Sequence, residues 1–155
     1  QLAAHLGLPY AFASHFAPQQ LMQAIEIYRA TFQPSAQLAK PYVMLGFNVF
    51  CADTDEEARY RASSWQQAFV NLRSGRPGRL PPPVEGYRER VGPAEAALLD
   101  SVLSCSAVGS PQAVRAAVDA FVARTGADEL MVTSQVFDHQ ARLRSYELLA
   151  ELRQA

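Results

Sequence analysis

The chain has 155 residues, enough for one compact domain with a sizeable hydrophobic core. Its composition is typical of a globular protein, with 49% hydrophobic and 19% charged residues and a formal net charge of -1. This balance argues against nucleic acid or an anionic membrane surface as a partner. No apolar run approaches the roughly 18 residues of a membrane-spanning helix, and no signal-peptide pattern is recognised. We therefore expect a cytoplasmic protein.

The first third of the chain has the pattern of a strand-turn-helix unit. Residues 2–6 predict the end of a helix, which Gly7 and Pro9 terminate. Residues 10–15 form a short apolar run typical of a buried strand. Pro18 is well placed as the first residue of a helix, whose apolar spacing continues to about residue 32.

A second strand-helix unit follows a connector at residues 34–41. Residues 42–51 are apolar without clean alternation, as in a strand that is covered on both faces. Thr54 and Glu57 have the spacing of a capping box and predict a helix to about residue 73. Residues 74–92 are rich in Gly, Pro and Arg and lack periodicity, so we expect a lid-like insertion there.

The last third predicts two more helices and a strand. Residues 93–103 favour a helix, and Ser110 and Pro111 begin another that ends near Arg124. Residues 129–137 predict a third strand, after which Asp138 caps the final helix. Strands that alternate with helices imply parallel pairing with right-handed crossovers. The sequence thus predicts a single α/β domain over residues 1–155, with about three parallel strands and flanking helices.

Several common catalytic motifs are absent from the sequence. It contains no G-x-G-x-x-G, Walker P-loop, H-E-x-x-H or G-x-S-x-G motif. Cys51 and Cys105 lie in apolar contexts without metal-type neighbours, Cys105 in a region that we take as helical, and we expect two buried free thiols and no metal site. Candidate residues are therefore sought at the carboxyl ends of the strands, where parallel α/β barrels place their sites.

The first candidate patch follows the first predicted strand and consists of Ala13, Ser14, His15 and Phe16. Small residues let a planar ring approach the backbone, and a histidine can move a proton near neutral pH. The alternative is that His15 only packs under the following turn.

Two further patches lie on the other predicted strands. Asn48 interrupts an apolar run, close to Gly46, and its amide must find partners if it is buried. Thr133, Ser134 and Gln135 lie at the end of the last strand, where their hydroxyl and amide groups can face a site. For Asn48 the favoured alternative is packing in the interior of a barrel, and ordinary strand-end polarity also explains residues 133–135.

The chain resembles the bacterial luciferase-like family of flavin-dependent monooxygenases over residues 2–150. The resemblance is carried by LAAHLGLP at 2–9, YAFASHF at 10–16, GFNVFCAD at 46–53, VGSP at 108–111, ELMV at 129–132 and RLRSYELLA at 142–150. The last of these contains the family's Arg-Leu-x-Ser pattern at Arg142 and Ser145, where we expect the arginine to tie the final helix to the sheet. The resemblance implies the C-terminal part of a (β/α)8 TIM barrel, because a complete barrel takes roughly 250 residues.

The same resemblance implies an activity and roles for the candidate residues. Reduced FMN and dioxygen would oxygenate a small organic substrate, with the reduced flavin supplied by a separate reductase. Ala13 and Ser14 would contact the flavin, His15 would be catalytic, and Phe16, Asn48 and Ser134 would line the substrate pocket. The irregular segment at 74–92 would be mobile over the site.

The family's serine-containing loop for the flavin phosphate has no counterpart in this sequence. We therefore expect a full-length parent to be the enzyme, and the isolated chain to bind flavin weakly and to be inactive. Two alternatives stay open: an oxidoreductase of the same fold that uses the deazaflavin F420, and a non-catalytic α/β interaction module. A sheet with few strands leaves exposed edges, so a homo-oligomer is also expected.

Overall fold

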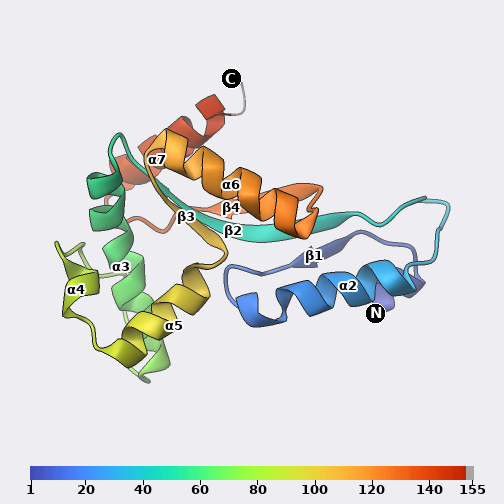
Figure 1. Ribbon diagram of the computed structural model, residues 1–155, viewed down its shortest axis with the longest axis horizontal. Helices are drawn as coiled ribbons and strands as arrows, with labels where there is room; N and C mark the ends of the chain where they lie inside the picture. Colours follow the sequence, from blue (N-terminus) through green and yellow to red (C-terminus); the bar gives the residue numbers. More distant parts are fainter. Residues whose placement is uncertain (153–155) are drawn as a thin grey trace.

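The computed structural model describes residues 1–152, which form one parallel sheet and its flanking helices (Figure 1). The strands are β1 (Tyr10–Phe12), β2 (Val43–Cys51), β3 (Ser106–Gly109) and β4 (Glu129–Thr133). The helices are α1 (Leu2–His5), α2 (Leu21–Thr31) after a short 3-10 turn at Pro18–Gln20, α3 (Asp55–Arg73), α4 (Tyr87–Arg90), α5 (Pro93–Leu103), α6 (Pro111–Thr125) and α7 (His139–Leu152). The predicted parallel α/β organisation is confirmed.

The structure adds one strand, β3, that sequence analysis does not identify. It has only four residues and directly joins α5 to α6, so its alternation of half-buried and buried positions is too short to stand out from the helices. Cys105 precedes this strand, and its carbonyl accepts a hydrogen bond from the backbone N–H of Asn48 at 3.1 Å. The expectation that Cys105 lies in a helical region is therefore wrong, although both cysteines are buried and free as predicted.

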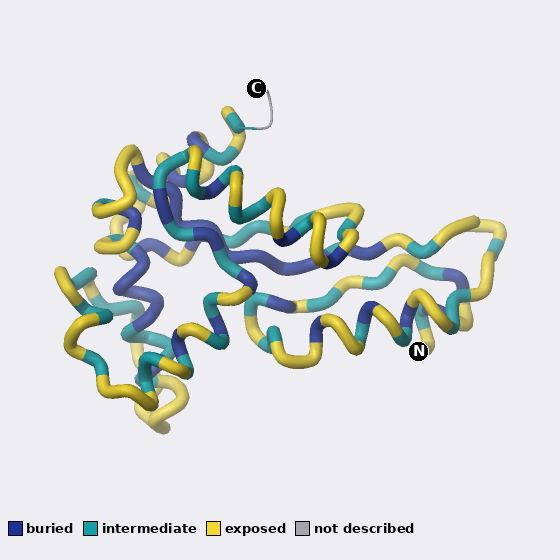
Figure 2. Tube along the Cα trace, in the orientation of Figure 1, coloured by how far each residue is buried: buried dark blue, intermediate teal, exposed yellow. Residues whose placement is uncertain are grey.

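β2 is the central strand and is paired along both edges. Met44 pairs with Ala11 of β1 and with Glu129 of β4, while Asn48 pairs with Ser106 of β3 and with Thr133 of β4. β4 therefore occupies one edge, and β1 and β3 share the other, one after the other. Figure 2 shows β2 as an almost continuous buried line through the molecule.

Two serine hydroxyls complete the hydrogen bonding of β2 where its neighbours end. Between β1 and β3 the Gly46 carbonyl accepts a hydrogen bond from the Ser14 hydroxyl at 2.6 Å. Beyond the end of β4 the Cys51 N–H donates to Ser145 Oγ at 3.0 Å, and the Ser134 hydroxyl also donates to Ser145 at 3.1 Å. Because buried backbone groups need partners, these hydroxyls take over the role of missing strand neighbours.

The two faces of the sheet differ in their cover, since successive side chains of a strand point to opposite faces. Val43, Leu45, Phe47, Val49 and Cys51 belong to the large core cluster, to which α2, α6 and α7 also contribute. On the second face Phe50 packs in a smaller cluster with Trp65 of α3 and Val102 of α5. Further along that face Ala11 is exposed and Met131 is 53% exposed. The second face is thus covered only near the carboxyl end of β2.

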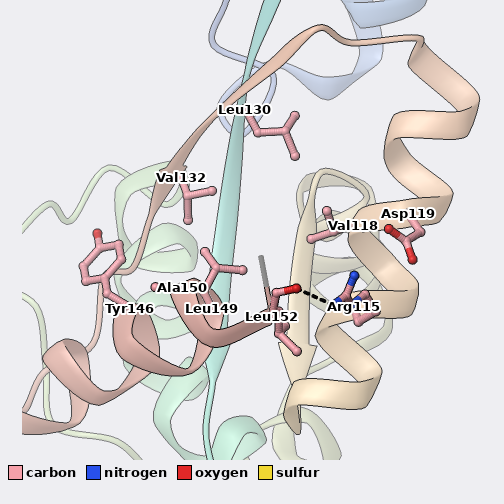
Figure 3. A pocket seen from close by; sticks show the side chains of 9 residues that line it. All are labelled: Arg115, Val118, Asp119, Leu130, Val132, Tyr146, Leu149, Ala150 and Leu152. Atoms are coloured by element: carbon pink, nitrogen blue, oxygen red, sulfur yellow. Dashed lines mark hydrogen bonds between the residues drawn. The ribbon is translucent and has the colours of Figure 1, made fainter. Parts of the chain in front are cut away.

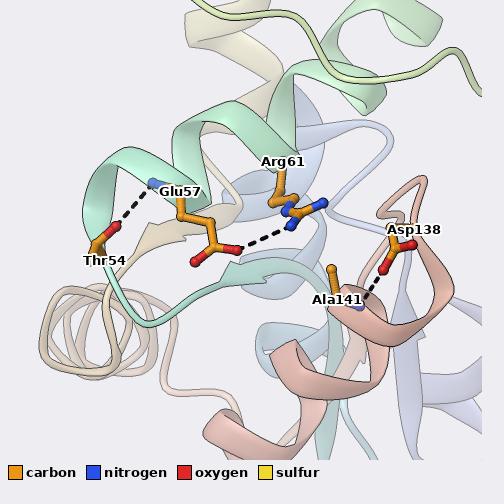
Figure 4. A network of polar contacts seen from close by, with 5 residues as sticks. All are labelled: Thr54, Glu57, Arg61, Asp138 and Ala141. Carbon is orange, nitrogen blue, oxygen red and sulfur yellow. Dashed lines mark hydrogen bonds and ion pairs between the residues drawn. The ribbon is translucent and has the colours of Figure 1, made fainter.

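The helices after β2 and β4 begin at side-chain caps, as the sequence predicts (Figure 4). Thr54 Oγ1 accepts a hydrogen bond from the Glu57 N–H at 3.2 Å, and Asp138 Oδ1 accepts one from the Ala141 N–H at 2.8 Å. The Glu57 carboxylate pairs with Arg61 at 3.2 Å, one turn further along α3. Only half of the predicted capping box therefore forms, because Glu57 is engaged by this cation.

None of the helices within residues 1–152 is long and apolar enough to cross a membrane.

The role of Ser145 is testable by Ser145→Ala. The substitution leaves the buried Cys51 N–H unpaired and removes the acceptor of the Ser134 hydroxyl, so we expect the free energy of unfolding to fall by about 1–3 kcal/mol. Urea unfolding followed by circular dichroism measures it. Ser74→Ala, at an exposed serine, is the matched control and should change stability by less than about 0.5 kcal/mol. Equal effects of the two substitutions would contradict the role given to Ser145.

Candidate active site at the carboxyl ends of the strands

A cavity of about 170 Å³ lies where β1 and β4 end, between these strand ends, α3 and the irregular segment. Its lining consists of His15 and Phe16 after β1, Gln135 after β4, Trp65, Ala68, Phe69 and Leu72 of α3, and Pro77 and Gly78 of the segment. The wall is therefore largely apolar and aromatic, with one imidazole and one amide. This cavity is the candidate site because its lining includes three residues that the sequence singles out, His15, Phe16 and Gln135.

His15 packs directly on Gly46 of β2. A Cβ atom at position 46 would lie 2.1 Å from His15 Nδ1 and 2.6 Å from Cε1, so the ring occupies the space that any other residue's side chain would need. The remaining ring atoms, Cδ2 and Nε2, lie farther from Gly46. Because Gly46 has no side chain, the imidazole lies directly on the sheet with Nδ1 towards Gly46. Nε2 is then the nitrogen that can reach the cavity.

The surroundings of His15 disfavour the charged form of its imidazole. Burial lowers the pKa of His15 below its ordinary value of 6.5. Nδ1 is buried and has no hydrogen-bond partner among the described residues. No carboxylate contributes to the shift, so desolvation alone sets its direction.

Aromatic rings of α3 form the opposite wall. Trp65 and Phe69 stack with their ring centroids 5.3 Å apart, and Trp65 also packs on Phe50 of β2. His15 meets Phe16 edge to face at 5.4 Å. Sequence analysis selects Gln135, at the end of the last strand, but it does not select Trp65 or Phe69. The only sequence signal for the two rings is their spacing of four on α3, which also fits ordinary core packing.

Two of the predicted site residues have their hydroxyls engaged by the protein itself. Ser14 is fully buried and donates to Gly46, and Ser134 is buried and donates to Ser145. Neither lines the cavity. The roles of Ser14 at the flavin and of Ser134 in the substrate pocket stay predictions, and the structure gives both serines a structural function.

Asn48 joins three strands on the second face of the sheet. Its Oδ1 accepts a hydrogen bond from Thr133 of β4 at 2.7 Å, and its Nδ2 donates to Ser106 of β3 at 3.4 Å. The side chain is fully buried. The buried amide thus finds partners across both edges of β2 and lies two residues beyond Gly46, on the same face as His15.

The other residues of the first patch are accessible. Ala13 is exposed, and Phe16 is 61% exposed at the border of the cavity. Pro77 and Gly78 of the segment at 74–92 line the cavity, and the role of this segment as a lid stays a prediction. This segment also contains the short helix α4, which interrupts the predicted irregular stretch.

The Arg-Leu-x-Ser pattern acts through its serine. Ser145 is the residue that joins α7 to β2, whereas Arg142 contacts His139 on its own helix at 3.0 Å. The hydrogen bond of Arg142 therefore stays within α7 and does not attach this helix to the sheet, contrary to the expectation. A serine hydroxyl that faces the sheet can accept a hydrogen bond from a free backbone N–H, whereas a guanidinium has no acceptor atom.

A larger cavity, of about 470 Å³, lies between α6, α7 and β4 (Figure 3). Leu130 and Val132, which pair with Leu45 and Phe47, place it on the opposite face of the sheet from His15. Its lining is mostly apolar and includes none of the predicted site residues. The smaller cavity is therefore the better candidate for the active site, because His15 lines it. Within residues 1–152 no group of three or more His, Cys, Asp or Glu side chains is arranged to hold a metal ion.

Fold and site together define a parallel α/β protein with an aromatic, histidine-containing cavity at the carboxyl ends of its strands. The family model for luciferase-like monooxygenases matches residues 1–129, and the chain belongs to this family. The crystal structure of apo-MsnO8 has the same fold, and its sequence is 34% identical. The TM-score is 0.79, and the match covers 98% of this chain and 46% of that one.

Two further relatives extend the comparison. A luciferase-like monooxygenase of Escherichia coli K12 is 48% identical over 99% of this chain and 46% of its own length. The oxygenating constituent of 3,6-diketocamphane monooxygenase from Pseudomonas putida, solved with FMN, shares the fold at 22% identity and a TM-score of 0.56, over 97% of this chain and 43% of that one. The chain spans about half the length of the curated relatives it matches.

The contact between His15 and Gly46 is testable by Gly46→Ala. The new methyl group overlaps the imidazole, so His15 must leave its place, and overpacking of this kind costs about 1–3 kcal/mol. We expect lower stability in urea and displaced His15 signals in NMR spectra. Gly78→Ala is the control, because a Cβ there meets no atom within 4 Å. Unchanged His15 signals in Gly46→Ala would contradict the contact.

The lowered pKa of His15 predicts a pH dependence of stability. Between the folded-state pKa and about 6.5 the unfolded chain binds a proton that the folded chain does not, so the free energy of unfolding falls as the pH drops through this window. His15→Asn removes this contribution. Urea midpoints from about pH 7.5 to about pH 5.5 should therefore fall more steeply for the wild type than for the variant. Parallel curves would show that His15 is not desolvated.

Proposed function

We propose that this chain forms part of the active site of a flavin-dependent monooxygenase that uses reduced FMN and dioxygen to oxygenate a small organic substrate. The proposal rests on one observation above all: His15 is pressed onto Gly46 beside an aromatic cavity at the carboxyl ends of the strands. Family membership and the FMN complex of a protein with the same fold support a flavin as the cofactor.

The residues of the second face fit the planar part of a flavin. Ala11 and Ala13 are small and exposed near the end of β1, so that a flat ring can lie close to the backbone. His15 Nε2 would hold or move a proton at the reacting atoms, because Nε2 of a neutral imidazole accepts a proton in one tautomer and donates a hydrogen bond in the other. Phe16, Trp65 and Phe69 would exclude water and contact the apolar substrate. When bound, the flavin supplies the activation of dioxygen.

The phosphate of FMN is not accounted for by the residues around the cavity. The lining contains no arginine, lysine or serine. We infer that the phosphate-binding residues belong to another part of a longer parent, of which this chain is the C-terminal part. The isolated chain would then bind flavin weakly and be inactive.

Further expectations follow from the same proposal. The segment at 74–92 acts as a lid, since Pro77 and Gly78 already line the cavity. A separate reductase supplies the reduced flavin, the protein works in the cytoplasm, and it assembles as a homo-oligomer through the open sheet edges.

A flavin titration tests the proposal on the chain itself. Reduced FMN, added in the absence of oxygen, should bind weakly and shift the NMR signals of His15 without saturation at one equivalent. The signals of His139, an exposed histidine on α7, serve as the internal control. Reduced F420 should give smaller shifts if FMN is the cofactor. Tight stoichiometric binding would contradict the inference about the phosphate, and unshifted His15 signals would contradict the flavin site and favour a non-catalytic module.

In the full-length parent, His15→Asn should lower kcat for substrate oxygenation by about 100-fold or more, the usual contribution of a positioned general acid or base. His139→Asn should leave kcat unchanged, because its side chain is exposed and does not line the cavity. Product analysis under excess reduced flavin gives both rates. A fall in kcat of less than threefold for His15→Asn would exclude the catalytic role.

A further inference from the structure

Three exposed arginines lie at the end of α3 and at the start of the irregular segment, and we call them the rim arginines: Arg73, Arg76 and Arg79. Their neighbours in the sequence line the cavity at His15: Leu72, Pro77 and Gly78. The rim arginines do not belong to this lining themselves. They therefore lie along the border of the cavity, where α3 and the irregular segment meet.

The path of the chain at this border is set by the way α3 ends. The Gly75 N–H donates to the Leu72 carbonyl at 3.1 Å. The Arg76 N–H donates to the Asn71 carbonyl at 2.8 Å, which completes the two hydrogen bonds of a Schellman motif. Gly75 has the left-handed conformation that this motif requires, with a φ of +72°. The turn brings the two residues after Arg76 to the cavity, so the arginines beside it belong to an ordered part of the chain.

The positive charges of the rim arginines are not neutralised by the described part of the chain. Other arginines of residues 1–152 are engaged: Arg29 at the end of α6, Arg61 by Glu57, Arg88 by Asp100 and Arg144 by Asp53. The guanidinium groups of the rim arginines form no hydrogen bond or ion pair with residues 1–152. Residues 58–84 contain no Asp or Glu, and no carboxylate lines the cavity. Because like charges repel, an anion at this border would be stabilised.

The interior of the cavity and its border suit different parts of a ligand. Phe16, Trp65 and Phe69 provide an aromatic interior for an apolar body. At the border the planar guanidinium of an arginine matches a carboxylate or a sulfonate, with which it can form two parallel hydrogen bonds. A positive border also raises the local concentration of anions at the cavity. A ligand that matches both parts has an apolar body and one anionic group.

We propose that the rim arginines select substrates that are small organic anions, with a carboxylate or sulfonate on an aromatic or aliphatic body. This inference rests on the proposed function, since it takes the ligand of the cavity to be the substrate of that reaction. The apolar body enters the cavity, and the anionic group stays at its border, where it accepts hydrogen bonds from Arg76 and Arg79.

Two probes of the same shape test the proposal by NMR titration of the isotope-labelled chain without flavin: benzoate, which is anionic, and benzamide, which is neutral. We expect benzoate to shift the signals of His15 and of the Trp65 indole, and to bind about fivefold more tightly than benzamide, as for a well-placed exposed ion pair. Raising the salt concentration from about 0.02 M to about 0.5 M should weaken the binding of benzoate and leave that of benzamide unchanged, because salt screens exposed charges.

Substitutions assign the charge to the rim. Arg76→Gln and Arg79→Gln, combined in one variant, should remove the preference for benzoate while benzamide binds as before. Arg90→Gln, at an exposed arginine of α4 that does not line the cavity, is the control and should keep the preference of the wild type. Dispersed amide spectra show that each variant is folded, and the salt titration of the wild type decides if the double variant is not.

The phosphate of FMN is a second anionic group that would suit the rim. FMN and riboflavin, which lacks the phosphate, separate this source from a substrate. If the rim arginines serve the substrate, the double variant leaves the ratio of FMN to riboflavin affinity unchanged. A fall in this ratio would assign the arginines to the cofactor and overturn the proposal.

The proposal is also overturned if benzoate and benzamide bind equally, if the double variant keeps the preference for benzoate, or if neither probe shifts the His15 and Trp65 signals up to its solubility limit. These results are independent of the proposed flavin site, because the two probes are titrated without flavin. Conversely, a chain that binds benzoate selectively but neither flavin would contradict the flavin site and leave the selection of anions intact.

Discussion

The structure depends on the requirement that β2, which is almost wholly buried and paired along both edges, must satisfy its backbone polar groups without water. β1, β3 and β4 meet most of this requirement, but none of them spans the whole strand. Where they end, the hydroxyls of Ser14 and Ser145 take over. The chain segments that follow β1 and β4 are therefore anchored to the middle of the sheet, and the position of the candidate site follows from this anchoring.

The candidate site lies beside the short stretch of β2 that pairs with neither β1 nor β3. Between the end of β1 and the start of β3, the strand β2 carries Gly46, and the turn held by Ser14 brings His15 over it. A residue with a side chain at this point would be the ordinary choice for a buried strand. Its absence lets an imidazole replace it, desolvated by the sheet on one side and open to an aromatic cavity on the other. The packing of His15 and its proposed chemical role both depend on the missing side chain at Gly46.

Much of the fold could be predicted from local signals that act within a few residues. The caps at Thr54 and Asp138 and the apolar run of β2 are such signals, and each has the expected structure. β3 was not predicted because four residues between two helices carry too little periodicity. In the site, His15 and Phe16 were found because they follow a strand. Trp65 and Phe69 were not, since their approach to His15 depends on how α3 crosses the sheet, which no local pattern encodes.

The packing of His15 on Gly46 links two positions that are 31 residues apart in the sequence. A larger residue at position 46 is tolerated only if position 15 becomes small enough to release the space, so the two sites are expected to change together in relatives that have lost the histidine. A side chain added at position 46 alone meets the imidazole, whereas a smaller residue at position 15 alone only leaves space beside Gly46. A designer who wishes to widen the cavity would obtain more from paired exchanges, with alanine at 46 and glycine or serine at 15, than from any single replacement.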